Sequence, residues 1–362
     1  MPRIWTPEGS RREDQADTGE LSLPLEPTSR TSPLTHRSGP PSGVKVGSGT
    51  RRGPVMATFP RMTDLFVPAG VLPVFQTPYN EDDSVDFATL EKELAWVFDH
   101  GSDGIVFAMV SEVLRLTDSE RMAVAEVACR AAQARGAVVI SVGAESTRAA
   151  VQFAIHAEEH GASAVMAIPP VSTAAPENEI VRYYESLIEV TRLPVIVQDA
   201  GGYVGRPMSI ATQARLAREF GDRVMFKPEA PPIGQRLSEL RDATDGQARV
   251  FEGSGGIALV DNYRRGVVGT MPGADLCWAL VALWSALEEG DLARADQLHA
   301  SLAALVALQT NLDAFLVIEK HLLRRQGVFA NTRVRGPVAY HLDTDTLAEV
   351  DRRFDQLVDL VG

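Results

Sequence analysis

Short β-rich runs alternate with helical patterns along most of this 362-residue chain, and this alternation limits the possible folds more than any other feature. The runs start roughly every 30 residues, the length that a right-handed βαβ unit needs. The predicted strands are Val71–Gln76, Gly104–Met109, Val138–Val142, Ala164–Ile168, Val195–Gln198, Val224–Lys227, Arg249–Glu252 and Val267–Thr270. The predicted helices between them include Phe87–His100, Ser119–Arg135, Thr147–His160, Glu177–Val190 and Ile210–Phe220.

Eight such units favour a closed (β/α)8 TIM barrel over an open doubly wound sheet, because the strand runs are apolar on both faces. We expect the barrel strands and helices in residues 65–273. Residues 274–362 show only helical periodicity, which predicts the last barrel helix and a C-terminal helical extension.

Residues 1–64 differ from the rest and predict a disordered N-terminal tail. Pro, Gly, Ser and Thr make up half of residues 1–60, without apolar periodicity, so the segment cannot bury enough surface to offset its ordering entropy. No apolar stretch typical of an export signal follows its first basic residue. Met56 and Met62 leave two interpretations open: a functional tail, or a translation start downstream of residue 1.

Charge and composition exclude several classes of partner. The net charge is −13 and no block of basic residues could neutralise a run of phosphates, so we expect no nucleic-acid partner. No apolar run of 18 residues predicts a membrane span. Cys129 and Cys277 lie in apolar helical stretches rather than in paired spacing, which indicates a reducing, cytoplasmic compartment.

The chemistry of a TIM barrel lies at the carboxyl ends of its strands, so the last residue of each strand and the loop after it are informative. Lys227 ends an apolar strand in a chain with only four lysines against thirty-one arginines. A desolvated lysine, unlike an arginine, can lose its proton, and attack on a carbonyl to form an imine needs a neutral amine. The alternative is a structural ion pair with Glu229 or Glu252, and residue type and position leave both interpretations open.

Several segments between residue 70 and the C-terminus resemble the dihydrodipicolinate synthase and N-acetylneuraminate lyase family. They are Val74–Pro78, Gly104–Glu120, Val142–Thr147, Phe226–Lys227 and Ile318–Lys320. The resemblance implies a class I Schiff-base lyase on a (β/α)8 barrel with three C-terminal helices, with Lys227 as the imine-forming residue. It also implies a homo-oligomer, a dimer or a dimer of dimers (homotetramer).

The chain departs from the family pattern at the positions that bind the carboxylate and relay protons. The family usually has Gly-(Ser/Thr)-Thr-Gly-Glu where this chain has residues 108–112, so Met109 and Val110 replace both hydroxyl donors. Gln198 and Val171 stand in place of two relay tyrosines, and Tyr203 replaces a carboxylate-binding arginine. These changes argue against dihydrodipicolinate synthase activity itself and predict a less polar pocket.

The sequence thus predicts an aldolase or dehydratase that acts on a 2-oxo acid or related carbonyl without metal or organic cofactor. Lys227 and Tyr203 are the predicted catalytic residues, Tyr203 as the proton-transfer group. The predicted substrate-binding residues are Thr77, Ser111, Glu112, Gln198, Glu229, Glu252 and Gly253. The alternative is a barrel that has lost catalysis and serves as a binding or scaffold protein.

Two other features favour structural interpretations. His156 to His160 spell H-x-x-E-H, a zinc-peptidase pattern, but they end the third predicted helix, on the barrel face opposite the active site. The sequence therefore favours a structural role for them over a zinc hydrolase. Lys320 lies on an amphipathic helix and is predicted to be solvated.

Overall fold

The computed structural model describes residues 67–201 and 206–362. The predicted N-terminal tail and Tyr203 lie outside the described residues.

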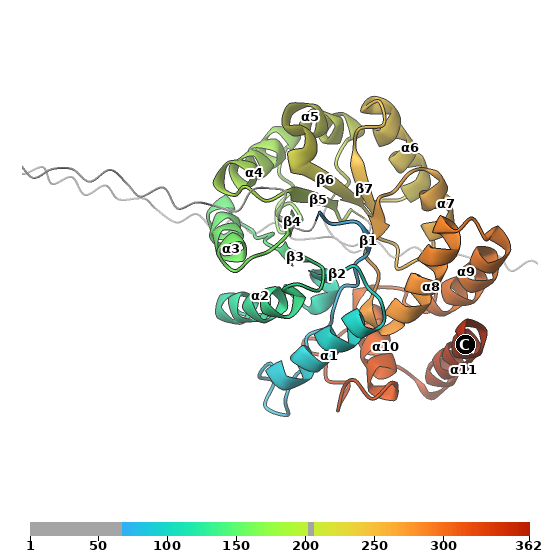
Figure 1. The fold of residues 1–362 in the computed structure, drawn as a ribbon. Coiled ribbons are helices and arrows are strands. Elements are labelled where there is room, and N and C mark those ends of the chain that lie inside the picture. Colours follow the sequence, from blue (N-terminus) through green and yellow to red (C-terminus); the bar gives the residue numbers. More distant parts are fainter. Residues whose placement is uncertain (1–66, 202–205) are drawn as a thin grey trace, which may run out of the picture. The chain divides into compact units, whose positions relative to one another are not determined.

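Eight parallel strands form the centre of the described part of the chain, in the order β1-β8-β7-β6-β5-β4-β3-β2 (Figure 1). Val74 forms parallel bridges both to Val106 and to Gly273, which join the first strand segment to its two neighbours. The fold is therefore the predicted (β/α)8 barrel. The strands are β1 (Gly70–Val71), β2 (Gly104–Phe107), β3 (Ala137–Ser141), β4 (Ala164–Ala167), β5 (Val195–Asp199), β6 (Val224–Pro228), β7 (Arg249–Glu252) and β8 (Gly269–Thr270).

The first strand is shorter than the sequence predicts, because Pro73 has no backbone N–H to donate to a ladder. Its carbonyl oxygen still accepts from the Val106 amide at 2.8 Å, so the backbone continues along the barrel as isolated bridges.

Helices surround the strands, and short polar side chains cap the N-termini of several of them. The Thr117 and Glu120 side chains form a capping box, and Ser146 and Ser209 each accept a backbone N–H of the first helical turn. The helices of the barrel are α1 (Phe87–Asp99), α2 (Asp118–Ala132), α3 (Thr147–Glu159), α4 (Glu177–Val190), α5 (Ile210–Phe220), α6 (Ile233–Ala243), α7 (Leu259–Arg264) and α8 (Cys277–Glu288). Short 3-10 turns include η2 (Met109–Ser111), η3 (Gly221–Arg223) and η4 (Ala274–Leu276).

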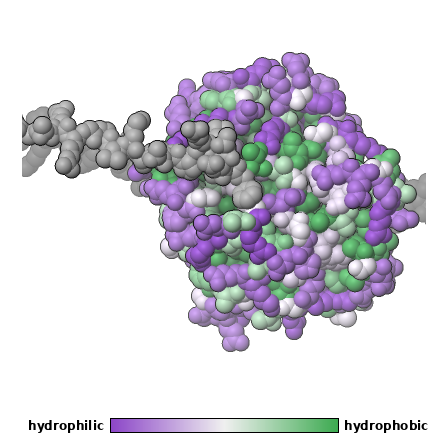
Figure 2. Space-filling model, viewed as in Figure 1, coloured by the Kyte–Doolittle hydropathy of each residue, from purple (hydrophilic) through white to green (hydrophobic). Residues whose placement is uncertain are grey.

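The apolar character of both strand faces has a direct cause in the packing. One set of side chains fills the barrel interior, including Leu72, Val139, Met166 and Phe251. A larger set lies between the strands and the surrounding helices. Polar, purple residues cover much of the outer surface in Figure 2, with apolar ones interspersed. Within the described ranges, no helix is long and apolar enough to cross a membrane.

The C-terminal region adds α9 (Leu292–Val306), α10 (Leu312–Arg325) and α11 (Thr344–Val361), in orange and red in Figure 1. Residues 326–343 contain no helix, although the sequence predicts helical structure throughout this region. Gly336 and Pro337 interrupt any helix there, and the segment runs over the barrel rim instead. The Asn331 side chain donates to the Tyr79 carbonyl oxygen at 3.0 Å, which ties the segment to the first strand–helix connection.

Candidate active site

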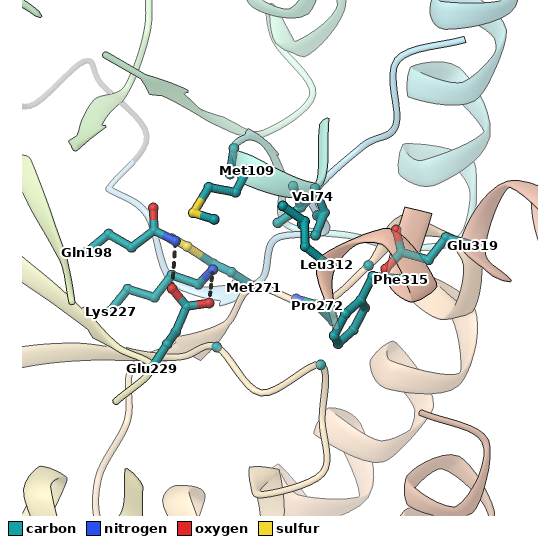
Figure 3. A pocket seen from close by; sticks show the side chains of 15 residues that line it. Val74, Met109, Gln198, Lys227, Glu229, Met271, Pro272, Leu312, Phe315 and Glu319 are labelled. Carbon is teal, nitrogen blue, oxygen red and sulfur yellow. Dashed lines mark hydrogen bonds and ion pairs between the residues drawn. The ribbon is translucent and has the colours of Figure 1, made fainter. Parts of the chain in front are cut away.

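Lys227 lies on β6 next to Gln198 on β5, since the two residues are paired in register at the carboxyl ends of their strands. The Lys227 side chain is 5% exposed, and its Nζ lies 3.1 Å from Glu229 Oε1. Gln198 Nε2 donates to the other oxygen of the same carboxylate at 2.6 Å (Figure 3). Glu229 therefore joins the lysine and the amide into one buried group.

Burial raises the pKa of Glu229, and the Lys227 ammonium and the Gln198 amide offset part of that rise. A carboxyl group with a raised pKa holds a proton more readily than an ordinary glutamate does. Glu229 is thus a group that can accept or return a proton within hydrogen-bond distance of an amine.

Gly253 provides the space for this pair. A Cβ added at Gly253 would lie 2.8 Å from both Lys227 Cε and Glu229 Cγ, which is closer than side chains approach. The absence of a side chain after β7 therefore lets Lys227 and Glu229 take these positions.

Lys227 Nζ and Glu229 face a pocket at the carboxyl ends of the strands. Met109 and Val110 form part of its wall, in agreement with the predicted loss of polar character, and Met109 lies across from Lys227 in Figure 3. The lining residues are Val74, Ala108, Met109, Val110, Gln198, Lys227, Glu229, Gly253, Gly255, Met271, Pro272, Gly273, Leu312, Phe315 and Glu319.

One helix beyond the barrel contributes three of these lining residues, and the sequence analysis did not identify them. Leu312, Phe315 and Glu319 come from α10, and Figure 3 shows the first two opposite the Lys227 group. Their spacing of three to four residues places them on one helix face. For Leu312 and Phe315 that spacing is the only sequence signal, and it is equally typical of core packing. Glu319 also lies in the Ile318–Lys320 segment that carries the family resemblance.

Four other predicted substrate-binding residues do not line the pocket. Thr77 Oγ1 donates to the Ser111 carbonyl oxygen at 2.6 Å, and the Ala108 amide donates to Ser111 Oγ at 3.1 Å. The Glu252 carboxylate accepts from Thr270 Oγ1 at 2.6 Å and from the Ser254 hydroxyl. Glu112 pairs with Lys320. Protein groups thus already engage the side chains of Thr77, Ser111, Glu112 and Glu252.

The prediction that Lys320 is solvated is wrong. Lys320 is fully buried, and its ammonium pairs with the Glu112 carboxylate and donates to the carbonyl oxygens of Thr77 and Arg333, each at 2.8 Å. Glu112 has a φ of 59°, a conformation unusual for a residue with a side chain. Burial lowers the pKa of Lys320, and the Glu112 charge opposes that shift. The amphipathic pattern failed here because the polar face of α10 packs on the barrel rim.

A second group of buried carboxyls begins at the pocket wall, where Glu319 lines the pocket, and continues behind it. The backbone N–H of Gln76 donates to Glu93 Oε1 at 2.8 Å, while the side-chain amide of Gln76 donates to Glu319. Asp275 and Glu319 both lie against the Cα of Gly273. Burial raises the pKa of all three carboxyls, that of Asp275 to about 7. In the described residues, neither the pocket nor this group brings three His, Cys, Asp or Glu ligand atoms close enough to share a metal ion.

Known proteins share this architecture. The chain is 30% identical to L-2-keto-3-deoxyarabonate dehydratase of Azospirillum brasilense over 302 residues, which are 80% of this chain and 95% of the relative. Dihydrodipicolinate synthase of Acinetobacter baumannii, solved with pyruvate, superposes with a TM-score of 0.73 at 24% identity, covering 80% of this chain and 99% of that one. Sialic acid aldolase of Ruminococcus gnavus gives 0.73 at 18% identity, over 81% and 97% of the two chains.

A family model defines the relationship. The model of the dihydrodipicolinate synthetase family matches residues 67–357, nearly all of the described part of the chain. The family includes dehydratases and aldolases, which are lyases that act on small 2-oxo acids. The fold, the arrangement of segments and this match together mean that the chain belongs to the dihydrodipicolinate synthetase family.

Proposed function

We propose that this chain is a lyase that forms an imine through Lys227 and dehydrates a 2-oxo-3-deoxy acid. The observation that carries the proposal is the buried Lys227–Glu229 pair, which faces the pocket at the strand ends. The pair supplies both the amine that imine chemistry needs and a neighbouring group to move protons.

The chemistry follows from these two groups. Lys227 Nζ adds to the C2 carbonyl carbon of the substrate, and loss of water leaves a C=N bond. Glu229 takes a proton from C3, and the electron pair of that C–H bond forms an enamine. The nitrogen lone pair then restores the C=N bond, the C2=C3 pair forms a C3=C4 double bond, and the C4–O bond breaks as the hydroxyl is protonated and leaves as water. Water hydrolyses the unsaturated imine and releases Lys227.

The similarity to a deoxyarabonate dehydratase supports dehydration as the reaction, since the chain covers 95% of that relative. The pocket supports it too, because Met109 and Val110 replace the hydroxyl donors of the synthase pattern. Gln198 can donate or accept a hydrogen bond but cannot transfer a proton near neutral pH, so it positions Glu229 and the substrate. We assign proton transfer at the leaving hydroxyl to Tyr203, which follows β5 in the sequence.

Borohydride trapping tests the imine. The protein is incubated with pyruvate and with a panel of 2-oxo-3-deoxy sugar acids, reduced, digested and analysed by mass spectrometry. We expect the mass of the reduced substrate on Lys227 and none in Lys227→Ala. Lys92→Ala is the matched control, because Lys92 is an exposed lysine on α1.

If trapping fails across the whole panel while the protein is folded, the proposal is wrong, and a binding or scaffold role is then favoured. Trapping without formation of a dehydrated product from the deoxy sugar acids would support the imine but contradict dehydration. The reaction would then be aldol cleavage, which the release of pyruvate would reveal.

We further propose that the chain forms a homo-oligomer, a dimer or tetramer, in a reducing cytoplasmic compartment. Exposed apolar side chains such as Leu114 and Leu292, each at least half exposed, support assembly. Light scattering at micromolar concentration should give a multiple of the chain mass, both for the full chain and for a chain that starts at Met56. A monomer would contradict the proposal.

A further inference from the structure

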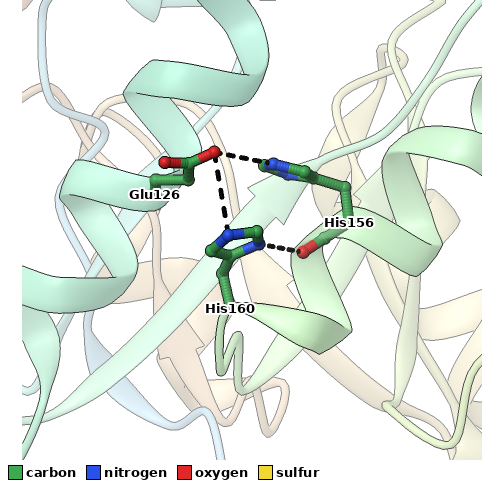
Figure 4. A group of neighbouring side chains, drawn as sticks. All are labelled: Glu126, His156 and His160. Carbon is green, nitrogen blue, oxygen red and sulfur yellow. Dashed lines mark hydrogen bonds and ion pairs between the residues drawn. The ribbon is translucent and has the colours of Figure 1, made fainter.

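Three metal-ligating side chains meet on the outside of the barrel, between α2 and α3. His156 and His160 are one turn apart at the end of α3, and Glu126 lies on the neighbouring helix α2 (Figure 4). His156 Nε2 lies 3.0 Å from Glu126 Oε1, and His160 Nε2 lies 3.7 Å from the same oxygen. We propose that Glu126, His156 and His160 form a binding site for a divalent transition metal of the zinc type.

The spacing of the three ligand atoms fits such an ion. Zinc binds imidazole nitrogen and carboxylate oxygen at about 2.0–2.2 Å, so two ligands of a tetrahedral site lie about 3.3 Å apart. The two separations from Glu126 Oε1 fall on either side of that value. All three ligand atoms lie within 4.8 Å of one another, so small side-chain rotations bring them around one ion.

The orientation of His160 is also that of a metal ligand. Its Nδ1 lies 2.8 Å from the His156 carbonyl oxygen, which can only accept, so Nδ1 carries the hydrogen. In the neutral ring, Nε2 then has a free lone pair directed at the lone pairs of Glu126 Oε1. A cation between these atoms removes the repulsion, and a backbone hydrogen bond to the far ring nitrogen is the usual second partner of a metal-bound histidine.

The site is accessible to an ion from solvent. Its three ligands also leave one position of a tetrahedral metal unfilled. The side chains of Glu126 and His160 are 45% and 38% exposed. Both border a groove that also includes Cys129 and Gln133 of the same region. His160 precedes β4, whereas Lys227 is near the end of β6, so the site is at the opposite end of the barrel from the pocket. The metal would therefore link α2 to α3 and stabilise the fold rather than take part in the reaction at Lys227.

The sequence motif did not identify this set of ligands. H-x-x-E-H uses the glutamate within the motif, but Glu159 is exposed and is not part of the cluster. The third ligand comes from another helix, 30 residues earlier in the chain than His156. The zinc-peptidase interpretation is thus not supported, while a different site shares two of its residues.

Metal titration of the untagged, chelator-treated full chain tests the proposal. Co²⁺ is used as a spectroscopic probe and Zn²⁺ is titrated by calorimetry. We expect one equivalent of either ion, visible Co²⁺ bands of low coordination number, and a melting temperature that rises until one equivalent of Zn²⁺ is present. Loss of a group that only orients a ligand costs 10- to 100-fold in metal affinity, so His156→Gln and His160→Gln should each cost about 100-fold or more.

His299→Gln is the matched control, since His299 is a half-buried histidine outside the cluster, and its Nε2 contacts the Ile257 carbonyl oxygen. It should bind Zn²⁺ as the wild type does. Turnover of the metal-free forms should be equal in all three variants, and circular dichroism should confirm that each is folded. The proposal is overturned if the wild type binds no stoichiometric ion, or if His160→Gln binds as tightly as His299→Gln.

Discussion

At the scale of single residues, the sequence left open whether Lys227 forms an imine or an ion pair, and whether its partner is Glu229 or Glu252. The structure pairs it with Glu229, because residues two apart at a strand end point to the same side. Thr270 and Ser254 hold the Glu252 carboxylate instead. An ion pair in the resting protein is compatible with imine chemistry, because the same carboxylate then serves as the proton acceptor.

Glu229→Gln tests that role. The amide that replaces the carboxylate keeps the shape of the side chain but cannot take a proton. It also accepts a weaker hydrogen bond from Gln198. We expect trapping at Lys227 to persist while turnover falls by about 10²- to 10⁴-fold, the usual contribution of a general acid or base. Steady-state kinetics with the trapped substrate measures it.

Tyr203→Phe is the comparison for Glu229→Gln. It should also preserve trapping and lower turnover by about 10²-fold or more if Tyr203 protonates the leaving group. Unchanged turnover in Tyr203→Phe would exclude that role and assign both transfers to Glu229. Unchanged turnover in Glu229→Gln would remove Glu229 from the mechanism.

Gly253→Ala tests the space that the pair occupies. The added methyl group would overlap Lys227 Cε and Glu229 Cγ, so one or both of these side chains must shift. We expect trapping and turnover to fall by about tenfold or more, since misplacement by about 1 Å can cost 10²-fold. Gly336→Ala is the control, because a Cβ there meets only open space. Equal activity of the two variants would show that Gly253 does not set the position of Lys227.

At the scale of elements, the sequence predicted the strands and barrel helices well, since Arg249–Glu252, Glu177–Val190 and Ile210–Phe220 match the observed bounds. Apolar runs and helix caps are local signals. Burial on both strand faces requires the apolar runs, and the unpaired backbone N–H groups at helix starts require the caps. The contribution of α10 and of residues 326–343 to the rim could not be predicted. Lys320 and Glu112 are 208 residues apart in the chain, and no local pattern reports such a contact.

Lys320→Met tests how α10 is attached to the rim. The substitution removes the ammonium that pairs with the buried Glu112 carboxylate and leaves the more distant Arg115 Nη1, at 3.6 Å, as its ion-pair partner. The carbonyl oxygens of Thr77 and Arg333 also lose a donor. Breaking a buried pair by removal of one partner typically costs about 3–5 kcal/mol, and we expect a loss of this size in the free energy of unfolding. Urea titration measures it.

The double variant Glu112→Gln/Lys320→Met is the control, since it removes the uncompensated charge as well. It should recover part of the lost stability. If Lys320→Met unfolds at the wild-type urea concentration, the buried pair does not hold α10 in place.

At the scale of the whole molecule, one end of the barrel holds the Lys227 pocket, and a group of buried carboxyls lies at and behind the pocket wall. Glu93, Asp275 and Glu319 come from α1, η4 and α10, so three separate parts of the chain share this polar interior. Their raised pKa values make global stability depend on pH in a definite direction.

Burial raises the pKa of Asp275 from 3.8 to about 7. Between pH 4 and pH 7 the folded chain keeps a proton that the unfolded chain has released, so the free energy of unfolding should fall as pH rises through this range. Asp275→Asn is uncharged at every pH and should reduce that slope. Urea midpoints at pH 5, 6 and 7 measure the slope.

Glu349→Gln is the control for this prediction. The half-exposed Glu349 has a pKa lowered to about 2 by Arg352 and Arg353, so it is ionised in the folded state and mostly ionised in the unfolded state above pH 5, and it should contribute little to the slope there. A slope in Asp275→Asn equal to that of the wild type would contradict the prediction.

Two consecutive residues of α10 face different parts of the molecule. Glu319 lines the pocket, while Lys320 anchors the rim through Glu112 and Arg333. Each residue of an α-helix is rotated by about 100° from the previous one, so inserting or deleting one residue before Glu319 would turn both side chains away together. Substitutions at Leu312 or Phe315 can therefore reshape the pocket freely, whereas the length of the chain between Leu312 and Lys320 is fixed by the anchor. Divergence of substrate preference among relatives should consequently proceed by exchange of side chains along α10 and not by changes in its length.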